Sequence, residues 1–163
     1  MAKPGPDDDA IAELFHDHGQ LSALVLAVRD ALARVESGAS TLTDALEELE
    51  DGAEALREGL LAHFGREEEA VFPFVDRRLP TLRSRIEGLI GDHDAVLSRA
   101  VELARAVAQA RAGVGFALCV SSFGRFEERY AEHAKSEHAF LADVDAALDG
   151  AARESLREVL SET

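Results

Sequence analysis

The sequence predicts an all-α protein: an antiparallel up-down-up-down four-helix bundle followed by a short C-terminal helix. Its apolar residues recur at the three- and four-residue spacing of a helix rather than in alternation. Alanine, leucine, glutamate and arginine dominate the chain, and all four residue types favour helices. Prolines and glycine-containing turns divide it into four long segments joined by short loops, which pack most simply as an antiparallel bundle.

The first two helices are delimited by capping residues and a turn. An aspartate at position 7, 8 or 9 can cap the first helix, which we expect to run to about Val35. A turn over residues 37–40 follows, and the second helix begins near Thr41 or Thr43. We expect Pro73 to interrupt that helix, because proline lacks an amide hydrogen and crowds the preceding turn.

Two more long helices and a short one complete the chain. The third opens at Pro80 and Thr81 and runs to about Arg111, and the fourth covers roughly 116–148, where Gly150 is expected to end it. The predicted division is a flexible N-terminal tail (1–7), the four-helix bundle (8–148) and a short C-terminal helix (149–163) that packs on the bundle or trails from it.

Charge and composition exclude several classes of partner. Thirty-two acidic and 17 basic residues give a formal net charge of −15, which disfavours binding to nucleic acid. The single cysteine, Cys119, excludes an intramolecular disulfide and fits a reducing compartment. The N-terminus lacks the apolar core of a signal peptide, and no stretch approaches the ~18 apolar residues of a membrane span. We therefore expect a cytoplasmic protein without a membrane partner.

Short sequences around the histidines occur in two related pairs. The first and third expected helices contain LFHDHGQL (14–21) and LIGDHDAV (89–96). The second and fourth contain LAHFGREEEAVF (61–72) and YAEHAKSEHAFL (130–141). The chain therefore resembles two related helical hairpins placed one after the other.

In each hairpin, one histidine stands alone on its helix and another precedes a glutamate by four residues. Residues four apart lie on one face of a helix, one turn apart in height. These positions fall on stripes that are otherwise apolar, so their side chains are expected to point into the bundle. The candidate metal ligands are His18, His63, Glu67, His93, His133 and Glu137.

Each of these elements alone has an ordinary explanation. A lone histidine on an apolar face is usually a core histidine bonded to a backbone or carboxylate group, and His-x-x-x-Glu is commonly a surface pair. Together, four inward imidazoles and two inward carboxylates would be costly to bury without partners. A metal cation supplies those partners at once. Six ligands are too many for one tetrahedral zinc but suit two metals bridged by the two glutamates.

At these residues the sequence resembles the hemerythrin-like family, the HHE cation-binding domains. Its members are four-helix bundles with one histidine on the first and third helices and His-x-x-x-Glu on the second and fourth. The resemblance covers roughly residues 8–148 and includes the E-E-x-x-V-F-P run from Glu67 to Pro73. It implies two non-haem iron ions (Fe2+/Fe3+) that can carry an oxo or hydroxo bridge. Glu67 and Glu137 would bridge them, with the histidines as terminal ligands.

The resemblance also implies a small ligand, namely O2, NO or peroxide, bound at an open coordination position. Oxygen-carrying hemerythrins have a second histidine on the third helix, where this chain has Leu89 and Leu97, and a carboxylate where it has His138. The chain is therefore more similar to bacterial members with four histidines and two glutamates. Those members are associated with redox, nitric oxide or peroxide handling, or with iron sensing.

Residues around the expected centre have several interpretations. The phenylalanines could form a shell that limits water access and tunes the metal, or could be ordinary bundle core. Tyr130 lies one turn before His133 and could donate a hydrogen bond to the site or simply pack. His16 is expected on the opposite face from His18, and whether it or His138 adds a ligand is open. The phenylalanines concerned are Phe15, Phe64, Phe72 and Phe140.

Three other classes of protein share some of these features. A histidine phosphotransfer bundle, a signalling protein without metal, would use one exposed histidine; His133 has Lys135 nearby but lacks the glycine usual after such a residue. Ferritin-like proteins use Glu-x-x-His at spacing three, unlike this chain. A metal-free bundle would leave the histidines unexplained. The sequence leaves open whether the protein is an enzyme and whether it is a monomer or a homodimer.

Overall fold

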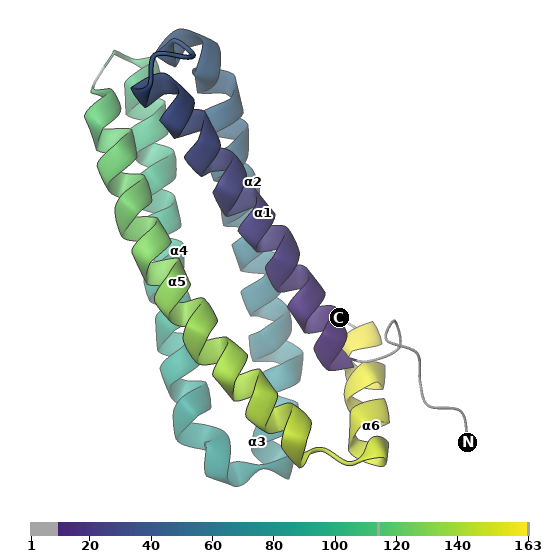
Figure 1. Cartoon of the computed structure of the whole chain (residues 1–163). Coiled ribbons are helices and arrows are strands. Elements are labelled where there is room, and N and C mark those ends of the chain that lie inside the picture. The colour runs from purple at the N-terminus through teal and green to yellow at the C-terminus, as the bar shows by residue number, and fades with distance from the viewer. Residues whose placement is uncertain (1–9, 114, 163) are drawn as a thin grey trace.

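The computed structural model describes residues 10–113 and 115–162, which are almost entirely helical and contain no strand (Figure 1). The predicted all-α class is confirmed, and the long helices form a bundle. The predicted N-terminal tail and the aspartates expected to cap the first helix lie outside the described residues. The elements are α1 (Ala10–Glu36), α2 (Leu42–Arg66), the π-helix η2 (Glu67–Val71), α3 (Phe72–Arg78), the 3₁₀-helix η3 (Pro80–Leu82), α4 (Arg83–Arg111), α5 (Phe116–Ala147) and α6 (Gly150–Ser161).

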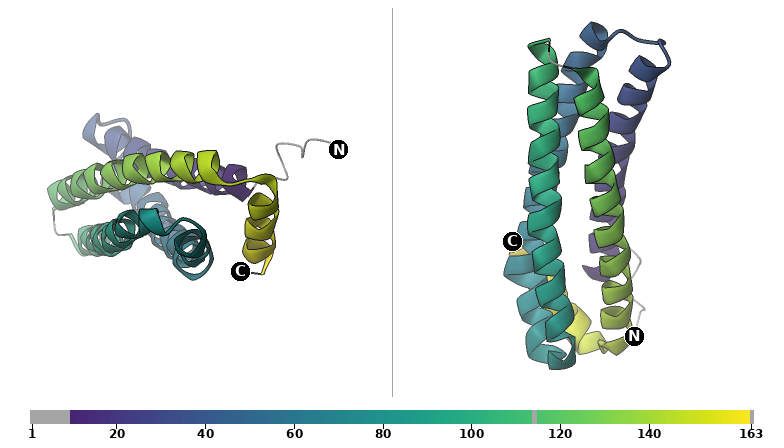
Figure 2. Two further views of the ribbon diagram at one scale, coloured as in Figure 1. Left: turned by 90° about the horizontal axis from the view of Figure 1, so that it is seen from below. Right: turned by 90° about the vertical axis from the view of Figure 1, so that its left-hand side faces the viewer.

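The four long helices lie side by side along one elongated axis. Helix α1 packs on α2 and α5, α2 also packs on α4, and α4 packs on α5. The turn between α1 and α2 lies at one end of the bundle, and η3 and α6 lie toward the other (Figures 1 and 2). Among the described helices, none combines the length and the apolar character needed to cross a membrane.

Among the described residues, two helices begin at a side chain that caps them. The Thr41 side chain accepts a hydrogen bond from the Asp44 amide at 3.1 Å and so caps α2, as the sequence predicts. The Asp149 carboxylate accepts one from the Ala152 amide at 2.8 Å and caps α6. The prediction that Gly150 ends the fourth helix is wrong, because α5 stops at Ala147 and Gly150 is the first residue of α6.

The predicted interruption at Pro73 takes another form. Instead of ending, the helix widens into η2, where the Phe72 amide donates to the Glu67 carbonyl five residues back, and it continues as α3. Pro73 lies in the first turn of α3, where a missing amide hydrogen is tolerated. The helix ends only at Leu79. Pro73 therefore follows a local π-helical turn and does not terminate the second helix.

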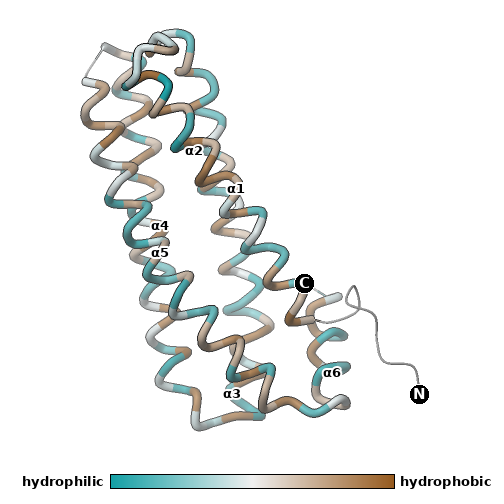
Figure 3. The backbone as a smooth tube through the Cα atoms, in the orientation of Figure 1, coloured by the Kyte–Doolittle hydropathy of each residue, from teal (hydrophilic) through white to brown (hydrophobic). Residues whose placement is uncertain are grey.

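The core consists of two apolar clusters placed one above the other along the bundle. Hydrophobic and hydrophilic stretches succeed one another along each long helix (Figure 3), and the buried residues of these helices are mostly apolar. The upper cluster, toward the α1–α2 turn, includes Leu21, Leu60, Val96 and Phe126. The lower cluster includes the apolar face of α6, which buries Ala152, Leu156 and Leu160 against the bundle. The C-terminal helix is therefore packed on the bundle.

Candidate metal centre

The six predicted ligands form a polar layer between the two apolar clusters. His18 lies on α1 between Leu14 of the lower cluster and Leu21 of the upper one, and His93 lies on α4 between Leu89 and Val96 in the same way. The two His-x-x-x-Glu pairs occupy the matching level of α2 with η2 and of α5. Helical periodicity places these residues on the inner face of each helix, and the packing of the helices brings them to the same height.

Five of these six side chains are almost completely removed from solvent. Glu67 is 0% exposed, His93 and His133 are each 1% exposed, Glu137 is 2% and His63 is 4%. The His18 side chain is 18% exposed, so the layer reaches the surface at α1. Two carboxyl groups and three imidazoles buried at this level require strong partners, because burial of unpaired polar groups is costly.

Two of the imidazoles, which we call the outer pair (His18 and His63), meet both glutamates. Their Nε2 atoms are 3.0 Å apart, and His18 Nε2 is 3.2 Å from Glu137 Oε2. His63 Nε2 is 3.6 Å from Glu67 Oε1 and 3.7 Å from Glu137 Oε1. One ligand atom from each of these four residues lies within 4.8 Å of the others, a separation suited to a shared metal cation.

The other two imidazoles, the inner pair (His93 and His133), contact the same two carboxylates. His93 Nε2 is 3.2 Å from Glu67 Oε2, and His133 Nε2 is 3.2 Å from Glu137 Oε2. Their ring centroids are 4.9 Å apart. Each glutamate therefore lies between an outer and an inner histidine.

The hydrogen-bonding state of this layer shows whether a metal would fit it. Despite the short approaches, seven buried side-chain atoms of these residues have no hydrogen-bond partner, including both oxygens of Glu67 and both ring nitrogens of His133. Buried polar atoms in proteins normally have hydrogen-bond partners, and a cluster of buried atoms without them is a clear exception. First-row metal ions bind imidazole nitrogens and carboxylate oxygens as ligands, so the residues present fit a metal cation.

The electrostatics of the two glutamates lead to the same conclusion. Burial, followed by the adjacent Glu137, raises the pKa of Glu67 well above its usual range. Burial also opposes ionisation of Glu137, but contacts with Glu67, His133 and the outer pair outweigh it and hold the pKa of Glu137 below its ordinary value. Without a cation, two neighbouring buried carboxyl groups cannot both be ionised. A metal would allow both to carry charge.

Comparison with known protein families agrees with this donor set. A family model described as the hemerythrin HHE cation-binding domain matches residues 9–144. The chain belongs to this family. The comparisons with curated proteins and with solved structures gave no significant match. For this hemerythrin-like protein, a metal cation site formed by histidine and glutamate side chains therefore rests on both the family and the geometry.

The aromatic residues around the hemerythrin-like centre are not spread evenly between the outer and inner histidine pairs. The Phe64 ring is stacked on the His93 ring, with centroids 3.8 Å apart and 4° between planes, and Phe72 lies 5.6 Å from the same ring. Phe140 packs edge-on against Phe72. Phe15 lies 6.0 Å from the partly exposed His18. The sequence left open whether these phenylalanines form a shell or ordinary core, and in the structure Phe64 and Phe72 stack on the inner pair at His93.

One contact at the centre was not predicted from the sequence. Glu68 Oε1 lies 2.7 Å from His93 Nδ1, the ring nitrogen that faces away from Glu67. In an ideal helix, the side chains of adjacent residues point about 100° apart and do not usually contact the same neighbouring residue. Within η2, Glu67 and Glu68 reach opposite edges of one imidazole. The run of three glutamates before Pro73 is the only sequence signal for this arrangement.

The remaining candidate residues interact with side chains other than the six predicted ligands. His16 is exposed, as predicted, and its Nε2 is 2.9 Å from the Gln20 amide. His138 is also exposed and lies against Phe15. Tyr130 is buried on Phe126, and its hydroxyl is 3.5 Å from that of Ser22. Neither His16 nor His138 belongs to the close group of ligand atoms, which consists of His18, His63, Glu67 and Glu137.

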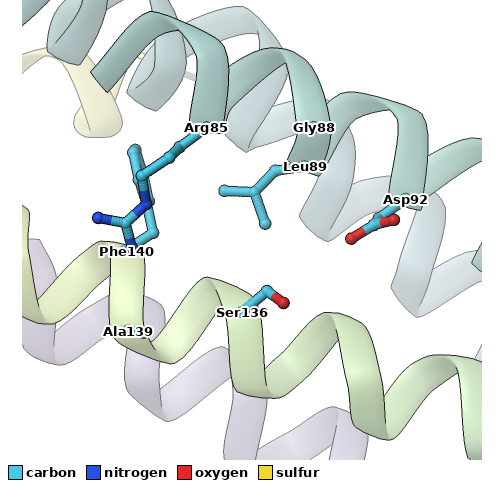
Figure 4. Close-up of a pocket in the computed structure, with 7 residues that line it drawn as sticks. All are labelled: Arg85, Gly88, Leu89, Asp92, Ser136, Ala139 and Phe140. Carbon is cyan, nitrogen blue, oxygen red and sulfur yellow. The ribbon is translucent and has the colours of Figure 1, made fainter. Parts of the chain in front are cut away.

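Two surface grooves differ in how they reach the centre of this hemerythrin-like protein. The α1–α2 groove has a volume of about 230 Å³, and the buried His63 forms part of its wall. The α4–α5 groove has a volume of about 400 Å³, and Leu89 and Asp92 point from α4 toward Ser136 of α5 (Figure 4). Its seven lining residues include none of the six predicted ligands. Only the α1–α2 groove of these two therefore touches the polar layer.

Proposed function

We propose that this protein holds two non-haem iron ions in an antiparallel up-down-up-down four-helix bundle and binds a small ligand, O2, NO or peroxide, at that centre. Its role would lie in redox, nitrosative or oxidative stress response, or in iron sensing. The observation that carries the proposal is the layer of buried, unpartnered donor atoms between the two apolar clusters. The iron pair would supply reversible electron transfer and an open position for the small ligand.

The contacts of the glutamates support a centre with two ions. Glu67 directs Oε1 toward His63 and Oε2 toward His93. Glu137 contacts both members of the outer pair and also His133. Each carboxylate is therefore shared between an outer and an inner imidazole, as a bridging role requires. Each histidine would bind one ion through Nε2.

The surroundings favour a small ligand. The inner pair is covered by aromatic rings, which exclude water and leave little room beside the imidazoles. The outer pair adjoins the α1–α2 groove, which offers a route from solvent. A diatomic molecule or peroxide would fit this route better than a large substrate.

The phosphotransfer alternative has less support. His133 is 1% exposed, so a phosphoryl donor on another protein could not reach its ring without unfolding α5. Its Nε2 also faces Glu137 at 3.2 Å, and a phosphoryl group placed there would meet a buried carboxylate. The alternative predicts phosphotransfer that His133→Ala abolishes while metal content is unchanged.

Metal analysis combined with spectroscopy tests the proposal. Purified protein should contain about two irons per chain and show near-ultraviolet absorption in air that changes on reduction and on addition of NO or peroxide. His63→Ala should remove iron and these spectral changes, whereas His16→Ala, which alters an exposed histidine outside the layer, should leave both intact. Iron-free protein that also fails to take up Fe2+ anaerobically would contradict the proposal.

A further inference from the structure

The outer edge of the His93 ring carries a contact that the other buried histidines lack. His93 Nδ1 lies 2.7 Å from Glu68 Oε1, whereas the Nδ1 atoms of His63 and His133 have no hydrogen-bond partner. Asp17 comes within only 3.9 Å of His63 Nδ1, beyond hydrogen-bond distance. Among these three buried imidazoles, only His93 therefore has a carboxylate within hydrogen-bond distance of its Nδ1 atom.

This contact determines which nitrogen of His93 carries the proton. A neutral imidazole has one N–H donor and one lone pair. A carboxylate accepts hydrogen bonds, so the bond to Glu68 places the hydrogen on Nδ1. The lone pair is then on Nε2, which points at Glu67 from 3.2 Å and makes no hydrogen bond of its own. That is the tautomer a metal ligand requires.

The π-helix makes this contact compatible with the position of Glu67. Glu67 is fully buried at the centre, while the Glu68 side chain is 40% exposed at the edge of the α2–α4 interface. Stacking of Phe64 on the ring restrains the tilt of His93, and the bond to Glu68 restrains its rotation in the plane. Glu67 and Glu68, which are adjacent in the sequence, thus contact the two ring nitrogens of His93.

We propose that Glu68 is a positioning residue that fixes His93 with Nε2 free to bind a metal cation. The proposal rests on the metal-binding function proposed above, because it assigns a role in that same centre. Carboxylates that orient a ligating imidazole typically contribute 10–100-fold to metal affinity. Glu68 is partly exposed, so it can be replaced without opening a cavity in the core.

The test compares Glu68→Ala and Glu68→Gln with the matched control Glu69→Ala, which removes the same charge from the adjacent exposed position. Anaerobic Fe2+ titrations against a chelator should show affinity reduced roughly 10–100-fold for Glu68→Ala. Glu68→Gln should lose less, because the amide oxygen can still accept from Nδ1. Glu69→Ala should match the original protein. Equal affinities for all four proteins would overturn the proposal.

A second measurement uses metal-free protein and does not depend on iron binding. In ¹⁵N-histidine spectra at pH 8, His93 should carry its hydrogen on Nδ1 in the original protein and in Glu69→Ala, and should shift toward the Nε2–H tautomer in Glu68→Ala. An Nε2–H tautomer in the original protein would overturn the role of Glu68. If the tautomer is as expected but no variant or parent binds Fe2+, the metal-binding function itself has failed.

Discussion

The outer and inner histidine pairs share two carboxylates but have different surroundings. The outer pair is partly exposed at His18 and adjoins a groove, and its ligand atoms cluster closely with those of both glutamates. The inner pair is 1% exposed, lies beneath stacked phenylalanines and has a carboxylate behind His93. Under the proposed function, the outer pair would face the incoming ligand, and the inner pair would be held in place and shielded from water.

The largest effect is expected when Glu67, which contacts both histidine pairs, is replaced. Glu67→Leu should abolish binding of iron at both pairs, because Glu67 is the partner of His63 and of His93. In the presence of EDTA the same variant should unfold at an equal or higher denaturant concentration, because a buried carboxyl group whose oxygens have no hydrogen-bond partner is replaced by an apolar side chain. Urea unfolding and metal analysis measure the two effects.

A variant that keeps two irons would show that the pairs do not depend on Glu67. Lower stability in EDTA would mean that the carboxyl group already has good partners in the metal-free protein.

The next prediction tests access from the two grooves. Ala62→Phe fills the α1–α2 groove beside His63, and Ala139→Phe places the same ring in the α4–α5 groove. Stopped-flow mixing of iron-loaded protein with azide should show association slowed about tenfold for Ala62→Phe, equivalent to ~1.4 kcal/mol of barrier. Ala139→Phe should leave the rate unchanged. The reverse order would place the route on the inner side.

The aromatic cover of the inner pair gives a moderate effect. Phe64→Leu should lower the free energy of unfolding by about 1–2 kcal/mol, because it removes a ring stacked on His93. It should also weaken Fe2+ binding, since His93 loses a restraint. The control is Phe123→Leu, a buried phenylalanine of the upper cluster, which should lose similar stability in urea without a change in Fe2+ affinity. Equal affinity losses in both variants would indicate a general effect of core packing.

The smallest effect is expected at Asp17, the acidic residue behind the outer pair. Asp17 is 3.9 Å from His63 Nδ1 and is already held by Arg66 at 2.6 Å. Asp17→Asn should therefore change Fe2+ affinity far less than Glu68→Ala and alter stability by less than about 1 kcal/mol, as for other exposed ion pairs. Chelator competition gives the comparison. A loss as large as that of Glu68→Ala would mean that both pairs are oriented in the same way.

The sequence was sufficient to predict the elements that depend on ideal helix geometry. Leu14, His18 and Leu21 share one face of a helix at any regular register, so the level of the polar layer could be predicted. The same holds for the four-residue spacing of His63 and Glu67. The start of the second helix near Thr41 or Thr43 was also predicted, and the structure shows that Thr41 is the cap.

What the sequence did not predict depends on departures from that geometry. Pro73 could have ended the helix or widened it, and packing of α3 against the lower cluster decides between these outcomes. Glu68, which contacts His93, lies in the π-turn, and a regular helical pattern does not predict such a turn. The α1–α2 groove depends on small residues, Gly59 and Ala62, meeting α1 at a particular distance. Such contacts are set by tertiary packing rather than by periodicity.

The most direct measurement is the number of Fe2+ ions that metal-free protein binds in an anaerobic titration. We predict saturation at about two per chain, with the outer and inner imidazoles joined through Glu67 and Glu137. Saturation at one would contradict a shared centre of two ions, and no binding at all would contradict the conclusion that a cation satisfies the buried donors.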